Sequence, residues 1–200
     1  MKKYLVIALA LGACGGFKKD YDIVDASENS RPKWAAADYV ADLNHGNDGW
    51  KYFLGENEAL ASGATKALCR AAAETKARYD FAAAIESNIK AAYREIESAA
   101  GESEDVSKNS QVSLDRALVV DKKIGGAEKY KDYWEQRSHK KDLGAAKDYR
   151  DYSCQVLIRM KQDLYESAIV QAAENMTTAL KAPKEEAKNI AEKAIGAELQ

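Results

Sequence analysis

A long alanine-rich segment constrains the fold of this chain more than any other feature. Between residues 59 and 99, apolar residues recur at spacings of three and four, which places them on one stripe of an α-helix. The stripe consists of Ala64, Ala67, Leu68, Ala71, Ala82, Ile85, Ile89, Ala92 and Ile96. Ser62 is the predicted N-cap and Gly101 the predicted stop. Because many stripe residues are alanines, we expect the helix to lie close to the layer that it covers.

Three segments have the character of β-strands. Residues 50–55 are rich in aromatic side chains and follow a predicted loop at residues 44–49. Residues 149–160 alternate more clearly, and this alternation predicts an antiparallel strand with one covered side. The predicted covered face consists of Tyr152, Cys154, Val156, Ile158 and Met160, and the opposite face of Ser153, Gln155 and Arg159. Residues 128–137 are a candidate edge strand.

Further helices complete the predicted fold. Residues 112–124 predict a helix that ends at two glycines, residues 162–180 return to helical spacing, and residues 184–200 predict a short charged helix after Pro183. This order predicts an α+β fold, a small antiparallel sheet covered on one face by the long alanine-rich helix and further helices. The formal charge of -2 gives no electrostatic reason to expect nucleic acid as a partner.

The first sixteen residues predict export and lipid attachment. Lys2 and Lys3 supply a positive start, and residues 4–13 are apolar. Their helical rise of about 15 Å is half of the roughly 30 Å of hydrocarbon in a bilayer. The run ends in Leu11-Gly12-Ala13-Cys14, which resembles the bacterial lipobox and implies lipidation of Cys14 and cleavage before it. An ordinary leader with an incidental cysteine is the alternative.

Lipidation would anchor the mature chain on a membrane, because two or more acyl chains such as palmitate bind almost permanently. Gly15 stands where an aspartate would mark inner-membrane retention, so we expect the outer membrane, with the periplasmic or outer face left open. The predicted organisation has four parts. They are a signal peptide at residues 1–13, the lipidated cysteine and a flexible tether at 14–31, an α+β domain at 32–182, and a charged terminal helix at 183–200.

Three features of residues 31–180 stand out together. They are Arg31-Pro32-Lys33-Trp34, Phe53-Leu54-Gly55 with the small residues that follow, and the tyrosine-bearing strand at 149–160. With these features the segment resembles the LPP20 family of bacterial outer-membrane lipoproteins. This chain differs by a polar insertion between Trp34 and Trp50 and by the charged tail after Pro183. The resemblance implies an envelope component with a structural or binding role, and it extends to a module of flagellar outer-membrane proteins.

The cysteines other than Cys14 leave two alternatives open. Cys69 and Cys154 could pair in an oxidising compartment, and a bridge across about 85 residues would contribute about 4 kcal/mol in the chain-entropy model. Two separate buried thiols that pack as small apolar groups are the other alternative. The predicted position of Cys69 on the long helix and of Cys154 on the covered strand face allows contact.

Other residue patterns predict no catalytic or metal site. His45 and His139 lie in different predicted loops without the spacing of metal ligands, and residues 44–48 lack the ligand alternation of a calcium loop. Ser153 has no nucleophile-elbow context, and the tyrosines and lysines of residues 130–141 fit half-buried packing better than stacking on sugars or bases.

We therefore expect a non-enzymatic lipoprotein without a cofactor, which binds other envelope proteins. A flagellar or outer-membrane assembly factor is one alternative. A hydrolase of cell-wall or surface polymers, with converging carboxylates, is another.

Overall fold

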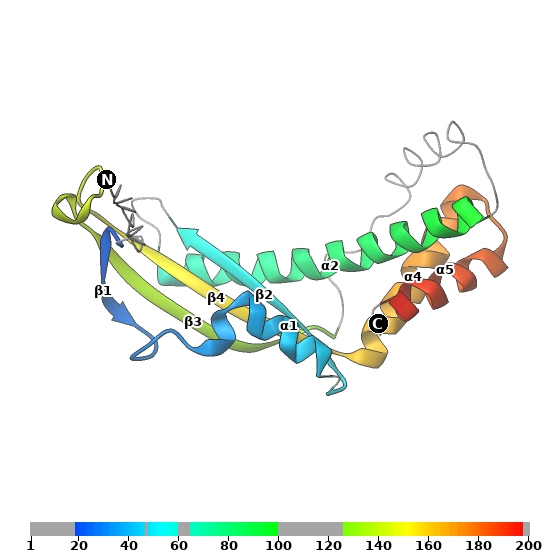
Figure 1. The fold of residues 1–200 in the computed structure, drawn as a ribbon, viewed down its shortest axis with the longest axis horizontal. Coiled ribbons are helices and arrows are strands. Elements are labelled where there is room, and N and C mark those ends of the chain that lie inside the picture. Colours follow the sequence, from blue (N-terminus) through cyan, green and yellow to red (C-terminus); the bar gives the residue numbers. More distant parts are fainter. Residues whose placement is uncertain (1–18, 47, 60–64, 100–125, 198–200) are drawn as a thin grey trace, which may run out of the picture.

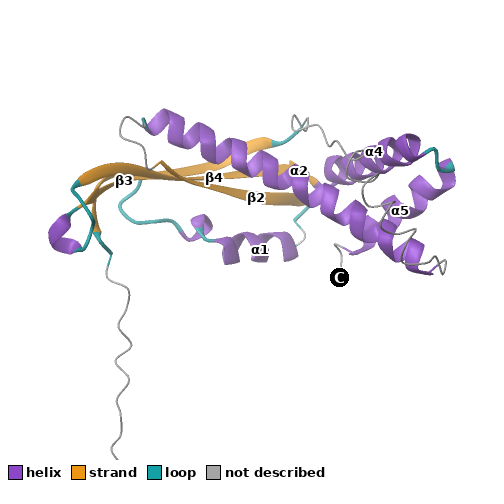
Figure 2. Cartoon of the chain, turned by 90° about the horizontal axis from the view of Figure 1, so that it is seen from above, coloured by secondary structure: helices purple, strands orange, loops and turns teal. Residues whose placement is uncertain are grey.

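Helix α2, Lys66–Ala99, connects the two ends of the molecule (Figure 1). The computed structural model describes residues 19–46, 48–59, 65–99 and 126–197. The N-terminal part of α2 lies over a β-sheet, and its C-terminal part extends past the sheet to α4, Gln162–Leu180, and α5, Lys184–Ala197 (Figures 1 and 2). The result is an elongated α+β fold.

The sheet has four antiparallel strands in the order β1-β3-β4-β2. Their bounds are Tyr21–Ala26 for β1, Trp50–Ala59 for β2, Glu128–His139 for β3 and Tyr149–Lys161 for β4. Strands β3 and β4 form a hairpin whose turn contains the short 3₁₀ helix η2, Lys141–Leu143. Gly144 ends that turn at a φ of 112°, a left-handed conformation that glycine adopts without a steric penalty.

A close contact between α2 and β2 sets the spacing of the two layers. A Cβ atom at Gly55 would lie 1.9 Å from the carbonyl oxygen of Ala73 and 2.5 Å from the backbone nitrogen of Ala77. The small side chains on α2 and the missing one on β2 therefore let two backbones approach each other. The alanine-rich composition predicted such an approach, and here it is a direct helix–strand contact.

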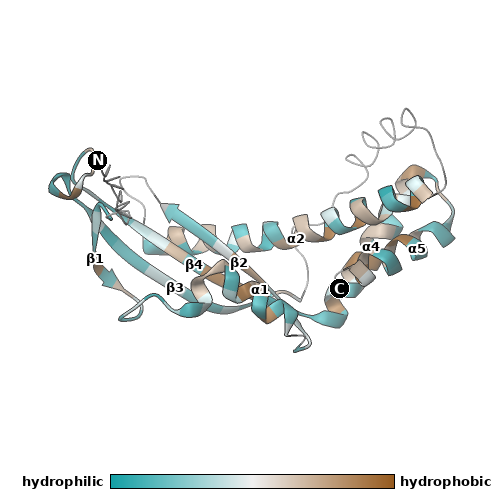
Figure 3. Ribbon diagram, viewed as in Figure 1, coloured by the Kyte–Doolittle hydropathy of each residue, from teal (hydrophilic) through white to brown (hydrophobic). Residues whose placement is uncertain are grey.

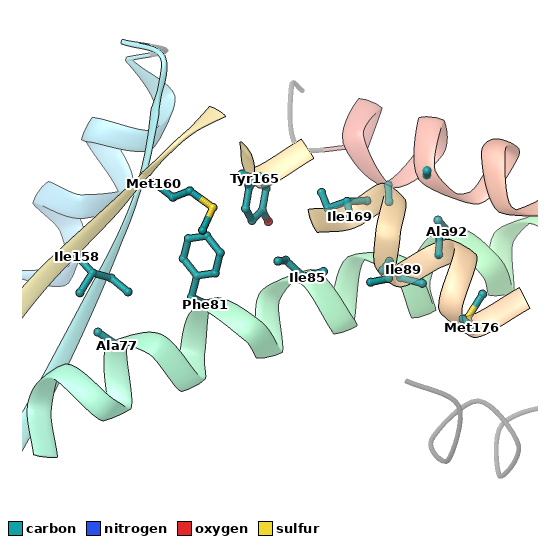
Figure 4. Packing of buried hydrophobic residues seen from close by; sticks show 14 of the residues in the cluster. Ala77, Phe81, Ile85, Ile89, Ala92, Ile158, Met160, Tyr165, Ile169 and Met176 are labelled. Carbon is teal, nitrogen blue, oxygen red and sulfur yellow. The ribbon is translucent and has the colours of Figure 1, made fainter. Parts of the chain in front are cut away.

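The main core continues from this contact along α2. Phe81, Ile85 and Ile89 of α2 are buried with Ile158 and Met160 of β4. Figure 4 shows the same row extending to Ile169 and Met176 of α4. Ile190, Ala191 and Ala194 of α5 belong to the same cluster. The terminal helix is thus part of the core and not a separate appendage.

A second, smaller cluster covers the opposite face of the sheet. The 3₁₀ helix η1, Lys33–Ala35, and helix α1, Ala37–His45, bring Trp34, Ala35 and Val40 onto Tyr133 and other sheet residues. Asn44 fixes α1 to β2, because its side-chain amide bonds both the backbone N–H and the carbonyl of Tyr52 at 2.8 and 3.0 Å. Both faces of the sheet are therefore covered over part of their area.

The predicted α+β class is confirmed, as are the strand at residues 149–160 and the helix at 162–180. The tether predicted as far as residue 31 is wrong from Tyr21 onward, where β1 begins. The side chains of β1 are mostly exposed, so the sequence of this strand shows no apolar pattern. Backbone pairing with β3 forms the strand instead. Strand β3 is a central strand and not the predicted edge.

Three further predictions also need correction. The loop predicted to begin at Asn44 is wrong there, because Asn44 and His45 end α1. The long helix begins at Lys66, since Ala59 belongs to β2. Strand β4 is buried on both faces, not one, as Ser153 and Gln155 are 1% and 3% exposed. The predicted cap Ser62, the stop Gly101 and the helix at 112–124 lie outside the described residues.

Replacing Gly55 tests the helix–strand contact. We expect Gly55→Ala to lower the free energy of unfolding by about 3 kcal/mol or more, because backbone atoms must move to admit the methyl group. Gly196→Ala in α5 is the matched control: its Cβ meets nothing within 4 Å, and a helical glycine-to-alanine change should stabilise by roughly 0.5–1 kcal/mol. Urea unfolding measures both, and a Gly55→Ala variant as stable as the parent would contradict the contact.

Candidate functional site

Six buried polar residues form a layer on the sheet face opposite α2. They alternate along the strands, since successive side chains of a strand point to opposite faces. The layer consists of Glu135, Arg137 and His139 of β3 and of Asp151, Ser153 and Gln155 of β4. All six are at most 7% exposed. The hairpin register places Glu135 opposite Ser153 and Arg137 opposite Asp151.

Arg137 holds the centre of this polar layer. Its Nε lies 2.7 Å from Glu135 Oε1, and its Nη1 lies 2.8 Å from Glu58 Oε1 on β2. The guanidinium also lies 4.6 Å from the ring centre of Tyr21 on β1. Burial lowers the pKa of Arg137, but the hydrogen bonds to Glu58 and Glu135 outweigh burial and the net pKa is raised. Arg137 therefore links three strands as a fixed positive charge.

Glu135 receives a second hydrogen bond from a tyrosine beside the layer on the same strand. The hydroxyl of Tyr133 donates to Glu135 Oε2 at 2.9 Å. Burial, together with this carboxylate, raises the pKa of Tyr133 to about 12. Tyr133 thus remains a neutral hydrogen-bond donor at any physiological pH.

His139 is the last residue of β3 and not part of a loop as predicted, and it lies between two carboxylates near the hairpin turn. Its Nδ1 is 3.1 Å from Asp20 Oδ1, and its Nε2 is 3.2 Å from Asp151 Oδ2. The imidazole stacks on Tyr149, with ring centres 4.2 Å apart and planes 3° from parallel. Burial raises the pKa of Asp151, against the opposing effect of His139 and Arg137.

Three polar atoms of the layer lack a hydrogen-bond partner among the described residues. They are Nε2 of His139, Oδ1 of Asp151 and Oε1 of Gln155. Nε2 of His139 and Oδ2 of Asp151 are nevertheless only 3.2 Å apart.

The side chains of the layer contact one another along and across the two strands. Ser153 lies opposite Glu135, whereas His139 lies opposite Tyr149, so Ser153 and His139 are not paired in the register. The Ser153 hydroxyl instead accepts a hydrogen bond from the Gln155 amide at 3.1 Å. The carboxylates of Glu135 and Asp151 are engaged with Arg137 and His139 and are buried from solvent. A nucleophile aligned with a base, as acyl transfer requires, is not formed by these residues.

The other residues considered as ligands have local structural roles. His45 is exposed at the end of α1. Asp48 accepts hydrogen bonds from the Trp50 backbone and the Tyr52 hydroxyl at 3.1 and 2.7 Å, which closes the turn before β2. Among residues 19–46, 48–59, 65–99 and 126–197, no group of three or more His, Cys, Asp or Glu side chains could hold a metal ion.

The two cysteines considered for pairing are joined. Cys69 of α2 and Cys154 of β4 form a disulfide with Cα atoms 5.9 Å apart, and both residues are fully buried. The bond ties the start of the long helix to the central hairpin. Cys14 lies outside the described residues.

Trp50 of β2 and Tyr130 of β3 make a further cation–π arrangement with Arg159 of β4, which the sequence patterns did not reveal. Arg159 lies between the rings of Trp50 and Tyr130, 4.1 and 4.3 Å from their centres, and its Nη2 is 2.7 Å from Glu128 Oε1. These rings pack on the protein's own arginine. The polar residues Asp151, Ser153 and Gln155, which alternate with Tyr152 and Cys154, are the one signal of the polar layer in the sequence.

Breaking the Arg137 pairs tests the energetics of the layer. We expect Arg137→Met to destabilise by about 3–5 kcal/mol, because it leaves the Glu135 carboxylate buried without its cation. Adding Glu135→Gln should recover much of that loss. The control is Glu58→Gln, whose side chain is 59% exposed and whose loss should cost less than about 1 kcal/mol. Urea unfolding that gives Arg137→Met and Glu58→Gln equal effects would show that the layer is not sensitive to its buried charge.

Asp151 should make stability depend on pH. Because its folded pKa is raised above the ordinary 3.8, its contribution is fully present below that value and is lost as pH rises through the folded pKa. Asp151→Asn removes this loss, so the variant should gain stability relative to the parent as pH rises toward neutrality. Denaturation at acidic and neutral pH measures the difference, and a pH-independent difference would argue against a raised pKa.

Comparison with known proteins finds no matching family model, no matching curated protein and no matching solved structure. The resemblance to the LPP20 family therefore remains a prediction from the residue patterns quoted above.

Proposed function

We propose that this protein is a bacterial lipoprotein, cut before Cys14 and anchored by lipid on the outer membrane, where its domain serves a non-enzymatic structural or binding role. The observation that carries the proposal is the sequence Leu11-Gly12-Ala13-Cys14 after a basic start and an apolar run. No described helix is long and apolar enough to span a bilayer.

The disulfide gives independent support for export. Disulfides form and persist in oxidising compartments such as the periplasm and are rare in the bacterial cytosol. The Cys69–Cys154 bond is fully buried and joins two layers of the core, as a structural disulfide does. A chain that relies on this bond for stability folds best after it has left the cytosol.

The polar layer supports a binding or structural role over hydrolysis. A glycoside hydrolase needs two carboxyl groups that face a substrate, whereas Glu135 and Asp151 are covered and contact Arg137 and His139. A role in flagellar or outer-membrane assembly is a second proposal, and it rests on the family resemblance alone.

Replacing Cys14 tests the anchor. Intact mass of the membrane-extracted protein should show a chain that starts at residue 14 and carries acyl groups, whereas Cys14→Ser should remain uncut and unlipidated. The matched variant Gly15→Asp keeps the cysteine, and in an enterobacterial host it should carry the same lipid but fractionate with the inner membrane. Alkylation without a reductant should leave Cys69 and Cys154 unmodified. A soluble parent chain without acyl mass would overturn the proposal.

A further inference from the structure

The described chain enters the domain at the turn of the β3–β4 hairpin. Strand β1 begins at Tyr21, which pairs with His139 at the end of β3. The carbonyl of Asp20 accepts a hydrogen bond from the backbone N–H of Lys140 at 3.1 Å. Figure 1 shows the start of β1 beside this turn, at the end of the molecule opposite α4 and α5.

Side-chain contacts fix this entry point. Asp20 lies against His139, and Asp22 pairs with Lys140 at 2.7 Å. The N-terminal segment is thus held to the hairpin by a strand pairing and two polar contacts. We call this end, residues 19–22 and 140–150, the hairpin end.

The short connection to Cys14 places the hairpin end near the lipid. Six residues separate Cys14 from Tyr21, and a fully extended chain covers at most roughly 3.5 Å per residue, so the span is at most about 25 Å. Helix α2, with 34 residues, rises about 50 Å toward α4 and α5. If Cys14 carries lipid, the hairpin end is therefore held within about 25 Å of the membrane surface, and α4 and α5 lie at the far end of the molecule.

The cations of the hairpin end face solvent. Lys141, Lys147 and Arg150 are exposed and have no ion-pair partner among the described residues. Among the neighbouring acids, Asp22 pairs with Lys140, Asp148 accepts a hydrogen bond from the Lys141 backbone at 2.8 Å, and Asp142 is exposed. The hairpin end thus has five lysines and arginines against four aspartates. The turn also presents the exposed side chain of Leu143.

At the opposite end of the molecule, helix α4 contains Asp163, Glu166 and Glu174 but no lysine or arginine. Helix α5 beside it is balanced, with three lysines and three glutamates. Figure 3 shows that the strands near the hairpin turn are mostly hydrophilic, whereas apolar residues are more frequent on α4 and α5. An anionic surface would attract the hairpin end and repel α4.

We propose that the hairpin end is a membrane-contact surface, at which Lys141, Lys147 and Arg150 bind anionic phospholipid headgroups and Leu143 reaches the interface. This inference rests on the proposed lipid anchor for its orientation. The charges predict membrane binding even without the lipid, because each basic side chain near an anionic bilayer strengthens binding by on the order of five-fold.

Vesicle binding by the unlipidated mature chain tests the surface. The chain beginning at residue 14 with Cys14→Ser is mixed with vesicles of phosphatidylglycerol and phosphatidylethanolamine, or of phosphatidylcholine alone. The test variant is Lys141→Gln with Lys147→Gln and Arg150→Gln. The matched control removes the same charge from exposed residues at the helical end: Arg94→Gln, Lys184→Gln and Lys188→Gln.

The proposal expects salt-sensitive binding to the anionic vesicles only. The hairpin variant should lose on the order of 100-fold in affinity, while the control stays near the parent. If both variants lost affinity equally, binding would depend on the net charge of the chain alone, and the proposed membrane-contact surface would be overturned. Binding to neutral vesicles that the hairpin variant retains, or no vesicle binding at all, would also overturn it and would leave a protein or cell-wall partner for this end.

Hydrogen exchange on the lipidated protein separates this inference from the anchor. In anionic vesicles, amides of residues 140–147 should become protected relative to detergent, and those of residues 181–183 should not. Absence of acyl mass on Cys14 would refute the lipid anchor, and the vesicle assay with the unlipidated chain would still test the membrane-contact surface. Acyl mass without protection at 140–147 would refute the hairpin surface alone.

Discussion

The backbone contact between α2 and β2 at Gly55 is the constraint on which the rest of the structure depends. It fixes how closely the helix lies on the sheet, and the buried residues of β4 fill the space that this distance leaves. The disulfide at Cys69 lies one turn before Ala73 and fastens the same region covalently. Farther along α2, where no sheet lies beneath the helix, α4 and α5 pack on it, and their buried residues belong to the same core cluster.

The parts of this architecture that bury an apolar pattern could be predicted from the sequence. The C-terminal half of the predicted α2 stripe, the apolar side of β4 and the helical spacing in α4 each reflect burial in the main core. The N-terminal half of the stripe is wrong: Ala67, Leu68 and Ala71 are exposed, because Cys69, Ala73 and Ala77 face the sheet there. Strand β1 and helix α1 could not be predicted in this way. Residues Ile23 and Val24 of β1 are about half exposed, and α1 buries a single residue, Val40, so neither leaves a clear periodic signal.

The polar layer escaped prediction for a related reason. Sequence patterns identify a covered strand face by its apolar residues, but this face of the hairpin is covered while it carries Glu135, Arg137 and Asp151. The pairing that makes such burial tolerable depends on Glu58 and Asp20, which come from distant parts of the chain. Only the strand order brings those partners together. The contact between Cys69 and Cys154, by contrast, could be considered from the sequence, because the predicted long helix and the predicted covered strand already allowed the two cysteines to meet.

The strand order also decides when the sheet can be completed. The central hairpin of β3 and β4 joins neighbouring stretches of chain and closes a short loop, but both edge strands come from the first third of the sequence. Strand β1 must wait for a partner more than a hundred residues away, and such non-local pairing is slow to form. The two N-terminal strands therefore remain without their sheet partners until the second half of the chain is available to pair with them.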